Sequence, residues 1–139
     1  MSASNNPATV GGPGGHIFST GVVGKVKSVS IRSGYRIDRI QLGYSSGATS
    51  DIYGGSGGNE PVQFNADGDE VIVAIIGRAG GRVDSLQFVT SNGTVSSFNG
   101  GTGGDPFTFQ APPGNFLVGI QGRCGAELDA FAPIWGTNA

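Results

Sequence analysis

The sequence has little of what metal enzymes, nucleic-acid-binding proteins and membrane proteins need. Its 139 residues include one cysteine and one histidine, so no internal disulfide forms and no ligand cluster for a metal is apparent. Eight Lys and Arg residues stand against ten Asp and Glu, without a basic run, which argues against a nucleic-acid partner. The longest apolar run, residues 71–76, is too short to span a bilayer, and we expect no membrane insertion.

The chain also lacks helical periodicity, because Gly or Pro interrupts every long window. Residues 1–7 have neither the basic nor the apolar segment of a secretory signal, so we expect a cytoplasmic or non-classically secreted protein. What remains are short runs with a period of two. Val29 and Ile31 alternate with polar residues, and Ile40 and Leu42 continue the pattern. Together these patterns predict an all-β protein.

Glycine is abundant, and it is clustered rather than scattered. Of 27 glycines, twelve lie in three GGxGG loops at residues 11–15, 54–58 and 100–104, here called the first, second and third glycine loops. Three Gly-x-x-x-Asp segments, the aspartate loops at residues 34–38, 80–84 and 125–129, end in aspartates about 46 residues apart. We expect one domain over residues 1–139, with an N-terminal arm or edge strand at 1–10 and repeats at about 11–53, 54–99 and 100–139.

Each repeat accommodates about four short strands: one after the glycine loop, two around the aspartate loop and one before the next glycine loop. Three repeats then predict three four-stranded antiparallel sheets around a pseudo-threefold axis. The Asn92-Gly93 pair predicts a tight hairpin turn between residues 87–89 and 95–98.

The recurring aspartate suggests a recurring polar site. A glycine after a strand lets the next amides point outward, and the aspartate brings acceptor oxygens close to these donors. Adjacent sugar hydroxyls both donate and accept hydrogen bonds, and they satisfy such a pair of groups. The glycine loop leaves room for a further backbone amide to approach the ligand.

Other interpretations of the same residues stay open. The aspartates could stabilise turns through their own backbone, which makes the chain a structural or toxin-associated scaffold. A glycosidase needs two carboxyl groups about 5–10 Å apart, and only Glu127 and Asp129 form a near pair in the sequence. A hydrolase built on Cys124 and His16 has little support, because neither residue recurs in the other repeats. We therefore expect no enzyme, no cofactor and no metal.

The repeated motifs, and above all residues 122–131 (GRCGAELDAF), resemble the jacalin-related lectins. The resemblance covers about residues 10–136, and it is strongest to the branch with one sugar site per repeat. It implies a β-prism I fold, mannose-type sugars or glycoproteins as partners, and a possible homo-oligomer. The galactose-binding branch uses an amino terminus freed beside the first glycine loop, whereas ten residues precede Gly11 here, which favours mannose.

The resemblance also implies which residues form each site. Each aspartate, together with two amides of its own loop, would face the last glycine of the glycine loop that follows, and the third site would join the two chain ends. The three-site branch has a tyrosine two residues before each aspartate, where this chain has Arg36, Arg82 and Glu127. The implied residues are Asp38, Tyr35, Arg36 and Gly58 for the first site; Asp84, Gly81, Arg82 and Gly104 for the second; Asp129, Ala126, Glu127 and Gly15 for the third.

Overall fold

A computed structural model describes residues 6–137 of the chain, and this part consists of twelve strands without a helix. Six strands are eight or nine residues long and pair as three hairpins around the aspartate loops, and the other six are short edge strands. The strands are β1 (Val10–Gly11), β2 (His16–Ser19), β3 (Val26–Ser33), β4 (Ile37–Tyr44), β5 (Tyr53–Gly54), β6 (Val62–Asn65), β7 (Ile72–Ala79), β8 (Val83–Thr90), β9 (Asn99–Gly100), β10 (Asp105–Gln110), β11 (Phe116–Cys124) and β12 (Leu128–Gly136).

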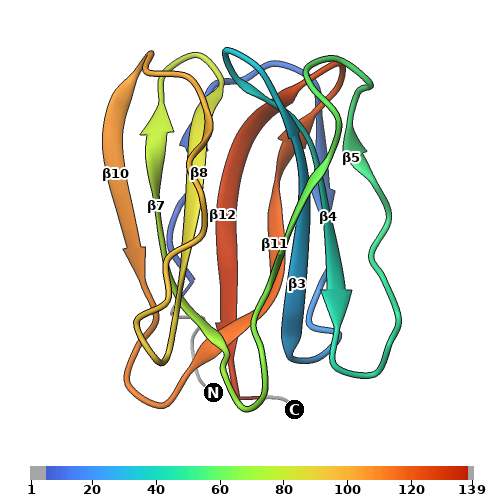
Figure 1. Ribbon diagram of the computed structural model, residues 1–139. Coiled ribbons are helices and arrows are strands. Elements are labelled where there is room, and N and C mark those ends of the chain that lie inside the picture. The colour runs from blue at the N-terminus through green and yellow to red at the C-terminus, as the bar shows by residue number, and fades with distance from the viewer. Residues whose placement is uncertain (1–5, 138–139) are drawn as a thin grey trace.

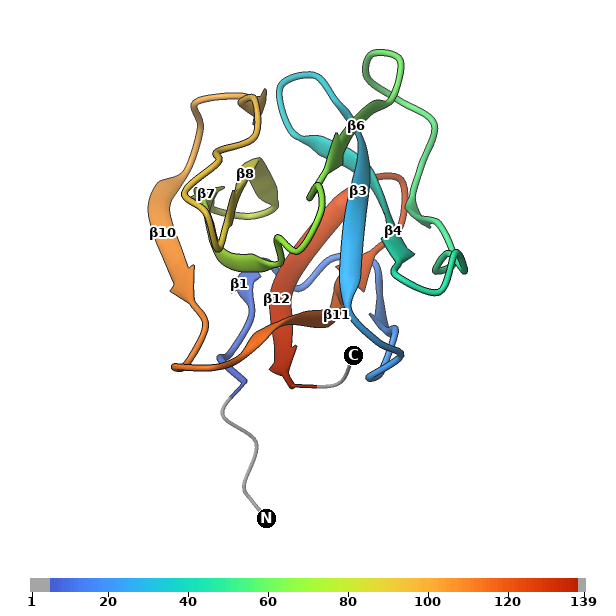
Figure 2. The same cartoon turned by 60° about the horizontal axis from the view of Figure 1, so that its bottom comes forward.

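The strands form three four-stranded antiparallel sheets, in the orders β1-β12-β11-β2, β5-β4-β3-β6 and β10-β7-β8-β9. Figure 1 shows the long hairpins side by side, and Figure 2 shows the three sheets arranged around a common axis. This confirms the predicted all-β class with three four-stranded sheets in a β-prism I arrangement. No helix of the described residues is long and apolar enough to cross a membrane.

Alternation along the strands explains how the three sheets share one core. Val29, Ile31, Ile40 and Leu42 are buried, as the period-two pattern predicts. Apolar residues from all three sheets join them in a single cluster, which also includes Trp135. Burial of apolar area at the axis is the main stabilising term for such a structure. One sheet alone exposes its apolar face, so the repeats depend on one another.

The sheets are offset by one strand from the repeats in the sequence. Each sheet contains an aspartate hairpin, the short strand after it, and the strand that follows the next glycine loop. The sheet of β11 and β12 takes these two outer strands, β1 and β2, from the other end of the chain. Of the expected arm at residues 1–10, Val10 lies in the edge strand β1, while residues 1–5 lie outside the described part.

Two local features shape the ends of the long hairpins. A register shift interrupts the pairing just before each aspartate loop, at Arg32/Ser33, Arg78/Ala79 and Arg123/Cys124, and such bulges re-aim the chain at the end of a strand. At the opposite end of β8, Gly93 has a φ of 85° and its N–H donates to the Thr90 carbonyl. Val89 and Val95 form an isolated antiparallel bridge across this turn, which confirms the hairpin predicted at Asn92-Gly93.

Candidate functional site

The three aspartates occupy equivalent positions at one end of the prism. Asp38, Asp84 and Asp129 begin the second strand of each long hairpin, at the top in Figure 1. They are 9%, 8% and 7% exposed. Among the described residues, no hydrogen-bond donor contacts the carboxylate of Asp38 or Asp84, and Asp129 has only an ion pair with Arg82 at 3.7 Å. Buried carboxylates normally have partners, so these three retain acceptor capacity for a ligand.

Each aspartate faces the glycine loop that the sequence resemblance implies. A Cβ on Gly58, Gly104 or Gly15 would lie 2.5–2.7 Å from one carboxylate oxygen of Asp38, Asp84 or Asp129. These glycines have φ values of 75°, 70° and 68°, a conformation that side chains other than glycine rarely adopt. Glycine at this position therefore serves both the turn and the close approach of the loop to the carboxylate.

The backbone of each aspartate fixes the same glycine loop from the other side. The carbonyl of Asp38 accepts a hydrogen bond of 2.8 Å from the Gly55 N–H, and Asp84 and Asp129 bind Gly101 and Gly12 at the same distance. The site aspartate thus positions its glycine loop through the main chain, while its side chain remains available.

Backbone amides of the aspartate loops add hydrogen-bond donors to each site. The N–H of Gly34 donates to the Arg36 carbonyl at 3.0 Å, and the same bond recurs at Gly80 and Gly125. The next two amides of each loop donate no backbone hydrogen bond within residues 6–137. These free donors belong to Tyr35 and Arg36, to Gly81 and Arg82, and to Ala126 and Glu127. Each site thus combines anionic acceptors with neutral backbone donors.

The first site lies in a shallow hollow that contains an exposed aromatic ring. Tyr35, Arg36, Asn59 and Glu127 line this hollow together with Asp38. Burial raises the pKa of Asp38, and the negative charge of Glu127 raises it further, against a smaller lowering by the guanidinium groups of Arg32 and Arg36. The side chain of Tyr35 is 90% exposed, so its ring is free to stack on a ligand.

This end of the molecule presents carboxylate acceptors and backbone amide donors, a set that can hold a polar ligand by hydrogen bonds. A family model described as the jacalin-like lectin domain matches residues 8–133. The chain belongs to the jacalin-like lectin family. The match includes all three aspartate loops, at residues 34–38, 80–84 and 125–129, and it ends within β12.

Solved structures of jacalin-like lectins share the fold over nearly the whole chain. Wild-type Malaysian banana lectin is 27% identical, with 98% of this chain and 100% of that chain covered and a TM-score of 0.85. The mannose-binding lectin from Champedak is 21% identical over 98% and 99% of the two chains (TM-score 0.86). The agglutinin of Calystegia sepium is 22% identical over 98% of both (TM-score 0.82). No curated relative matches the chain.

Three arginines hold the glycine loops of this jacalin-like lectin domain, and the sequence interpretation missed them. Arg78 donates from Nε to the Gly103 carbonyl at 3.1 Å and from Nη2 to the Gly104 carbonyl at 2.7 Å. Arg123 makes the same pair of bonds to Gly14 and Gly15 at 3.1 and 3.0 Å. The signal was present, because an arginine precedes each site aspartate at the same spacing in all three repeats.

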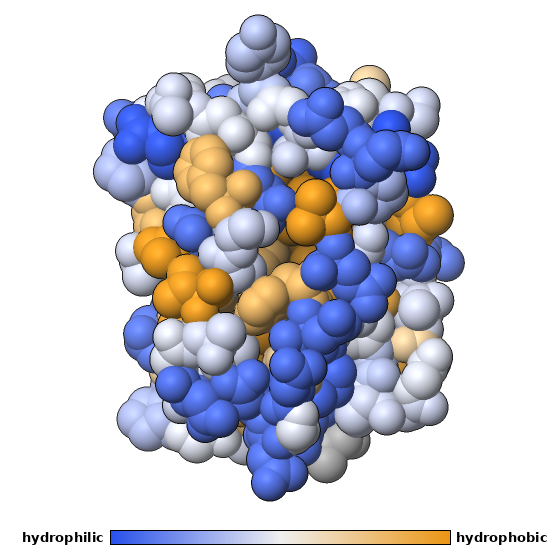
Figure 3. Space-filling view, in the orientation of Figure 1, coloured by the Kyte–Doolittle hydropathy of each residue, from blue (hydrophilic) through white to orange (hydrophobic). Residues whose placement is uncertain are grey.

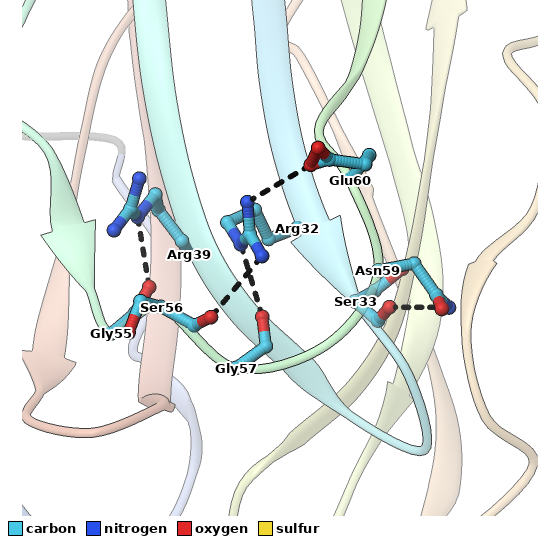
Figure 4. Close-up of polar contacts among 8 residues, drawn as sticks. All are labelled: Arg32, Ser33, Arg39, Gly55, Ser56, Gly57, Asn59 and Glu60. Carbon is cyan, nitrogen blue, oxygen red and sulfur yellow. Dashed lines mark hydrogen bonds and ion pairs between the residues drawn. The ribbon is translucent and has the colours of Figure 1, made fainter.

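The equivalent arginine of the first site is drawn in Figure 4. Arg32 donates to the carbonyls of Gly57 and Ser56 at 3.1 and 3.2 Å, while its Nη1 lies 3.8 Å from Glu60. Arg39 adds a bond of 2.8 Å to the Gly55 carbonyl in this repeat alone, because Ser85 and Ala130 occupy the equivalent positions. The rigid fork of a guanidinium matches two successive carbonyls, which a lysine does not reproduce.

The remaining candidates contribute little chemistry. Cys124 and His16 are neighbours, with Sγ and Nε2 4.0 Å apart, but burial raises the pKa of the Cys124 thiol, which keeps it protonated. No group of three His, Cys, Asp or Glu residues within residues 6–137 is arranged to hold a metal ion. The buried carboxylate of Glu70 lies elsewhere, where Thr90 and Thr94 donate to it at 2.9 and 3.0 Å.

Proposed function

We propose that the protein is a lectin that binds mannose-type sugars at three equivalent sites. One observation carries the proposal: three nearly buried carboxylates lack protein hydrogen-bond donors, and each lies beside free backbone amides and a glycine loop. Such unsatisfied groups are destabilising unless a ligand or solvent completes them. Their threefold recurrence distinguishes a repeated site from one incidental turn.

Adjacent hydroxyls of a hexose fit this arrangement. One hydroxyl donates to each carboxylate oxygen, and the hydroxyl oxygens accept from the two amides of the aspartate loop and from the last glycine of the glycine loop. In the first site these groups are Asp38, the amides of Tyr35 and Arg36, and Gly58. In the second they are Asp84, Gly81, Arg82 and Gly104, and in the third Asp129, Ala126, Glu127 and Gly15.

The structural relatives support mannose as the sugar class. The Champedak protein is described as mannose-binding, and artocarpin has been crystallised with mannopentose at 21% identity and a TM-score of 0.85. The surface of the site-bearing end is mainly polar or neutral in Figure 3, in keeping with a hydroxyl-rich ligand. A site of about five hydrogen bonds binds a monosaccharide weakly, near millimolar, or about −4 kcal/mol.

Three sites at one end of a rigid prism favour branched glycans. Their shared placement lets several mannose termini of one glycoprotein bind together, and such avidity exceeds single-site affinity by about 10² to 10⁴.

Binding without catalysis accounts best for the acidic residues. A glycosidase needs a second carboxyl group free to act as an acid or nucleophile. Glu127, the neighbour of Asp129 in sequence, instead holds Arg82 at 2.7 Å and Arg36 at 3.5 Å. A scaffold without sugar binding remains the second candidate, because the aspartate carbonyls do fix the glycine loops.

Calorimetry with methyl α-mannoside tests the proposal. We expect about three sugars per chain in the wild type and one fewer in Asp38→Asn. The matched control is Asp69→Asn, which removes an exposed aspartate in the turn before β7, at the end of that strand remote from the second aspartate loop, and should retain all three sugars. No binding to methyl α-mannoside or mannan would reject the lectin in favour of the scaffold. A single sugar per chain, unchanged in Asp38→Asn, would reject the repeated site.

A further inference from the structure

The three aspartate loops are in contact across the pseudo-threefold axis. Each glycine loop packs against the aspartate loop of another sheet: a Cβ on Gly12, Gly55 or Gly101 would lie 2.2–2.3 Å from the carbonyl oxygen of Gly81, Ala126 or Tyr35. The residue after each of these carbonyls is therefore placed beside a site of a different repeat. For the third aspartate loop that residue is Glu127, and the neighbouring site is the first.

The side chain of Glu127 does cross to the first site. Its carboxylate lines the hollow that contains Asp38, although its own backbone amide belongs to the third site. Two arginines orient it: Arg82 Nε lies 2.7 Å from Oε1, and Arg36 Nη1 lies 3.5 Å from Oε2. The side chain is only 23% exposed, so the pairs hold it in one place.

The third site shows the same crossover with the opposite charge. Arg82, whose amide belongs to the second site, has its Nε 3.7 Å from Asp129 Oδ1. The three sites share the same backbone groups and the same carboxylate, but side chains from neighbouring repeats line them differently.

We infer that Glu127 is a specificity-determining residue of the first site, contributed by the third repeat. This inference rests on the proposed sugar-binding function. Glu127 adds a second acceptor beside Asp38, which can receive a further hydroxyl of a neutral hexose. Its charge repels acidic sugars, so the first site should prefer neutral over anionic hexoses. Because Arg36 and Arg82 partly neutralise this charge, we expect it to change affinity by about two- to fivefold.

The same contact makes sugar binding at the first site sensitive to pH. The charged groups around Asp38 are Arg32, Arg36 and Glu127, of which Arg32 also pairs with Glu60 and Glu127 with Arg82. Glu127 raises the pKa of Asp38, second in effect to burial. Replacing Glu127 by Gln removes this repulsion and releases Arg36, and both changes lower the pKa. Asp38 then stays an ionised acceptor at a lower pH.

Amide resonances of Gly58, Gly104 and Gly15 report the three sites separately in one NMR spectrum. We would titrate methyl α-mannoside and mannose 6-phosphate into the wild type and Glu127→Gln from about pH 3 to 7. Glu60→Gln is the matched control, because it removes an equal charge 3.8 Å from Arg32, and Glu60 is 91% exposed outside the hollow.

In Glu127→Gln we expect the sugar-induced shift of Gly58 to persist to lower pH, with the preference for neutral sugar reduced about two- to fivefold. Glu60→Gln should behave as the wild type. An unchanged Gly58 profile in folded Glu127→Gln overturns the inference, as does a change at Gly15 alone. If methyl α-mannoside shifts none of the three glycines in the wild type, the proposed function itself is wrong.

Discussion

Replacement of Arg78 by Met should weaken sugar binding at the proposed second site without unfolding the protein. The substitution keeps an apolar stem of similar length and removes the two hydrogen bonds to Gly103 and Gly104, at 3.1 and 2.7 Å. Charge-assisted bonds contribute about 1.5–3 kcal/mol each when buried. Because Arg78 is partly exposed, we expect the loss of both bonds to cost about 1–2 kcal/mol of binding free energy, which lowers the sugar affinity by a factor of about 5–30.

The loss should appear in sugar affinity, because a released glycine loop must be ordered again when the sugar binds. Fixing the backbone of one residue costs about 1–2 kcal/mol, which is the size of the expected effect. The assay is an NMR titration with methyl α-mannoside in which Gly104 reports the second site, while Gly58 and Gly15 act as internal references. Arg78→Lys keeps the positive charge but not the forked geometry of the guanidinium, so its sugar affinity at Gly104 should lie between those of Arg78→Met and the wild type.

Lys27→Met is the matched control for stability. Lys27 also donates to two carbonyls, those of Gly68 and Glu70, but at the end of β3 remote from the aspartate loop. This variant should melt at a lower temperature and bind sugar normally. Equal weakening of all three sites in Arg78→Met would mean a general loss of stability. An unchanged affinity at Gly104 would refute the role of the arginine.

Because burial raises the pKa of Asp38, its ionised form opposes folding above that pKa, so Asp38→Asn should melt at the wild-type temperature or higher at pH 7 by calorimetry. In urea unfolding, Gly58→Ala should destabilise the protein by more than the roughly 1–2 kcal/mol of a strained φ, because the added Cβ would also lie 2.5 Å from an Asp38 carboxylate oxygen. Gly68→Ala is the control: Gly68 has a φ of 56° and open space around it, so this variant should show the cost of the strained φ alone. Hydrogen bonds from Thr90, Thr94 and the Asp67 N–H lower the pKa of Glu70. Ionised Glu70 therefore stabilises the folded protein above the unfolded-state pKa, and this stabilisation is lost as pH falls through the folded-state pKa. We expect Glu70→Gln to flatten the fall of melting temperature in acid.

Much of the fold was accessible from the sequence because each repeat signals it independently. The GGxGG loops require positive φ values that glycine adopts, and Gly15, Gly58 and Gly104 have them. Alternating Val, Ile and Leu residues predicted the buried face. The exchange of outer strands between repeats was harder to foresee, because short strands such as β1 and β9 have two residues each and carry no periodicity.

The backbone of the candidate site was foreseen, but its side-chain walls were not. Asp38 faces Gly58 as expected, because the hairpin and the glycine loop are neighbours in one sheet. The crossing of Glu127 into the hollow of Asp38 depends on contacts between different sheets, which spacing along the chain does not encode. Arg32 and its equivalents recur in the sequence, yet an arginine in a strand also suits a solvated face, so recurrence alone gave no role.

We propose that the three aspartates bind sugar rather than stabilise turns. The triple substitution of Asp38, Asp84 and Asp129 by Asn tests it, because it keeps the backbone carbonyls that hold Gly55, Gly101 and Gly12 while replacing one acceptor oxygen per site by a donor. Melting temperature and mannan binding are measured on the same sample. We predict near-native melting with no detectable binding, since each weak site loses about 1.5–3 kcal/mol per charged hydrogen bond. A large fall in melting temperature with mannan binding intact below it would contradict the account.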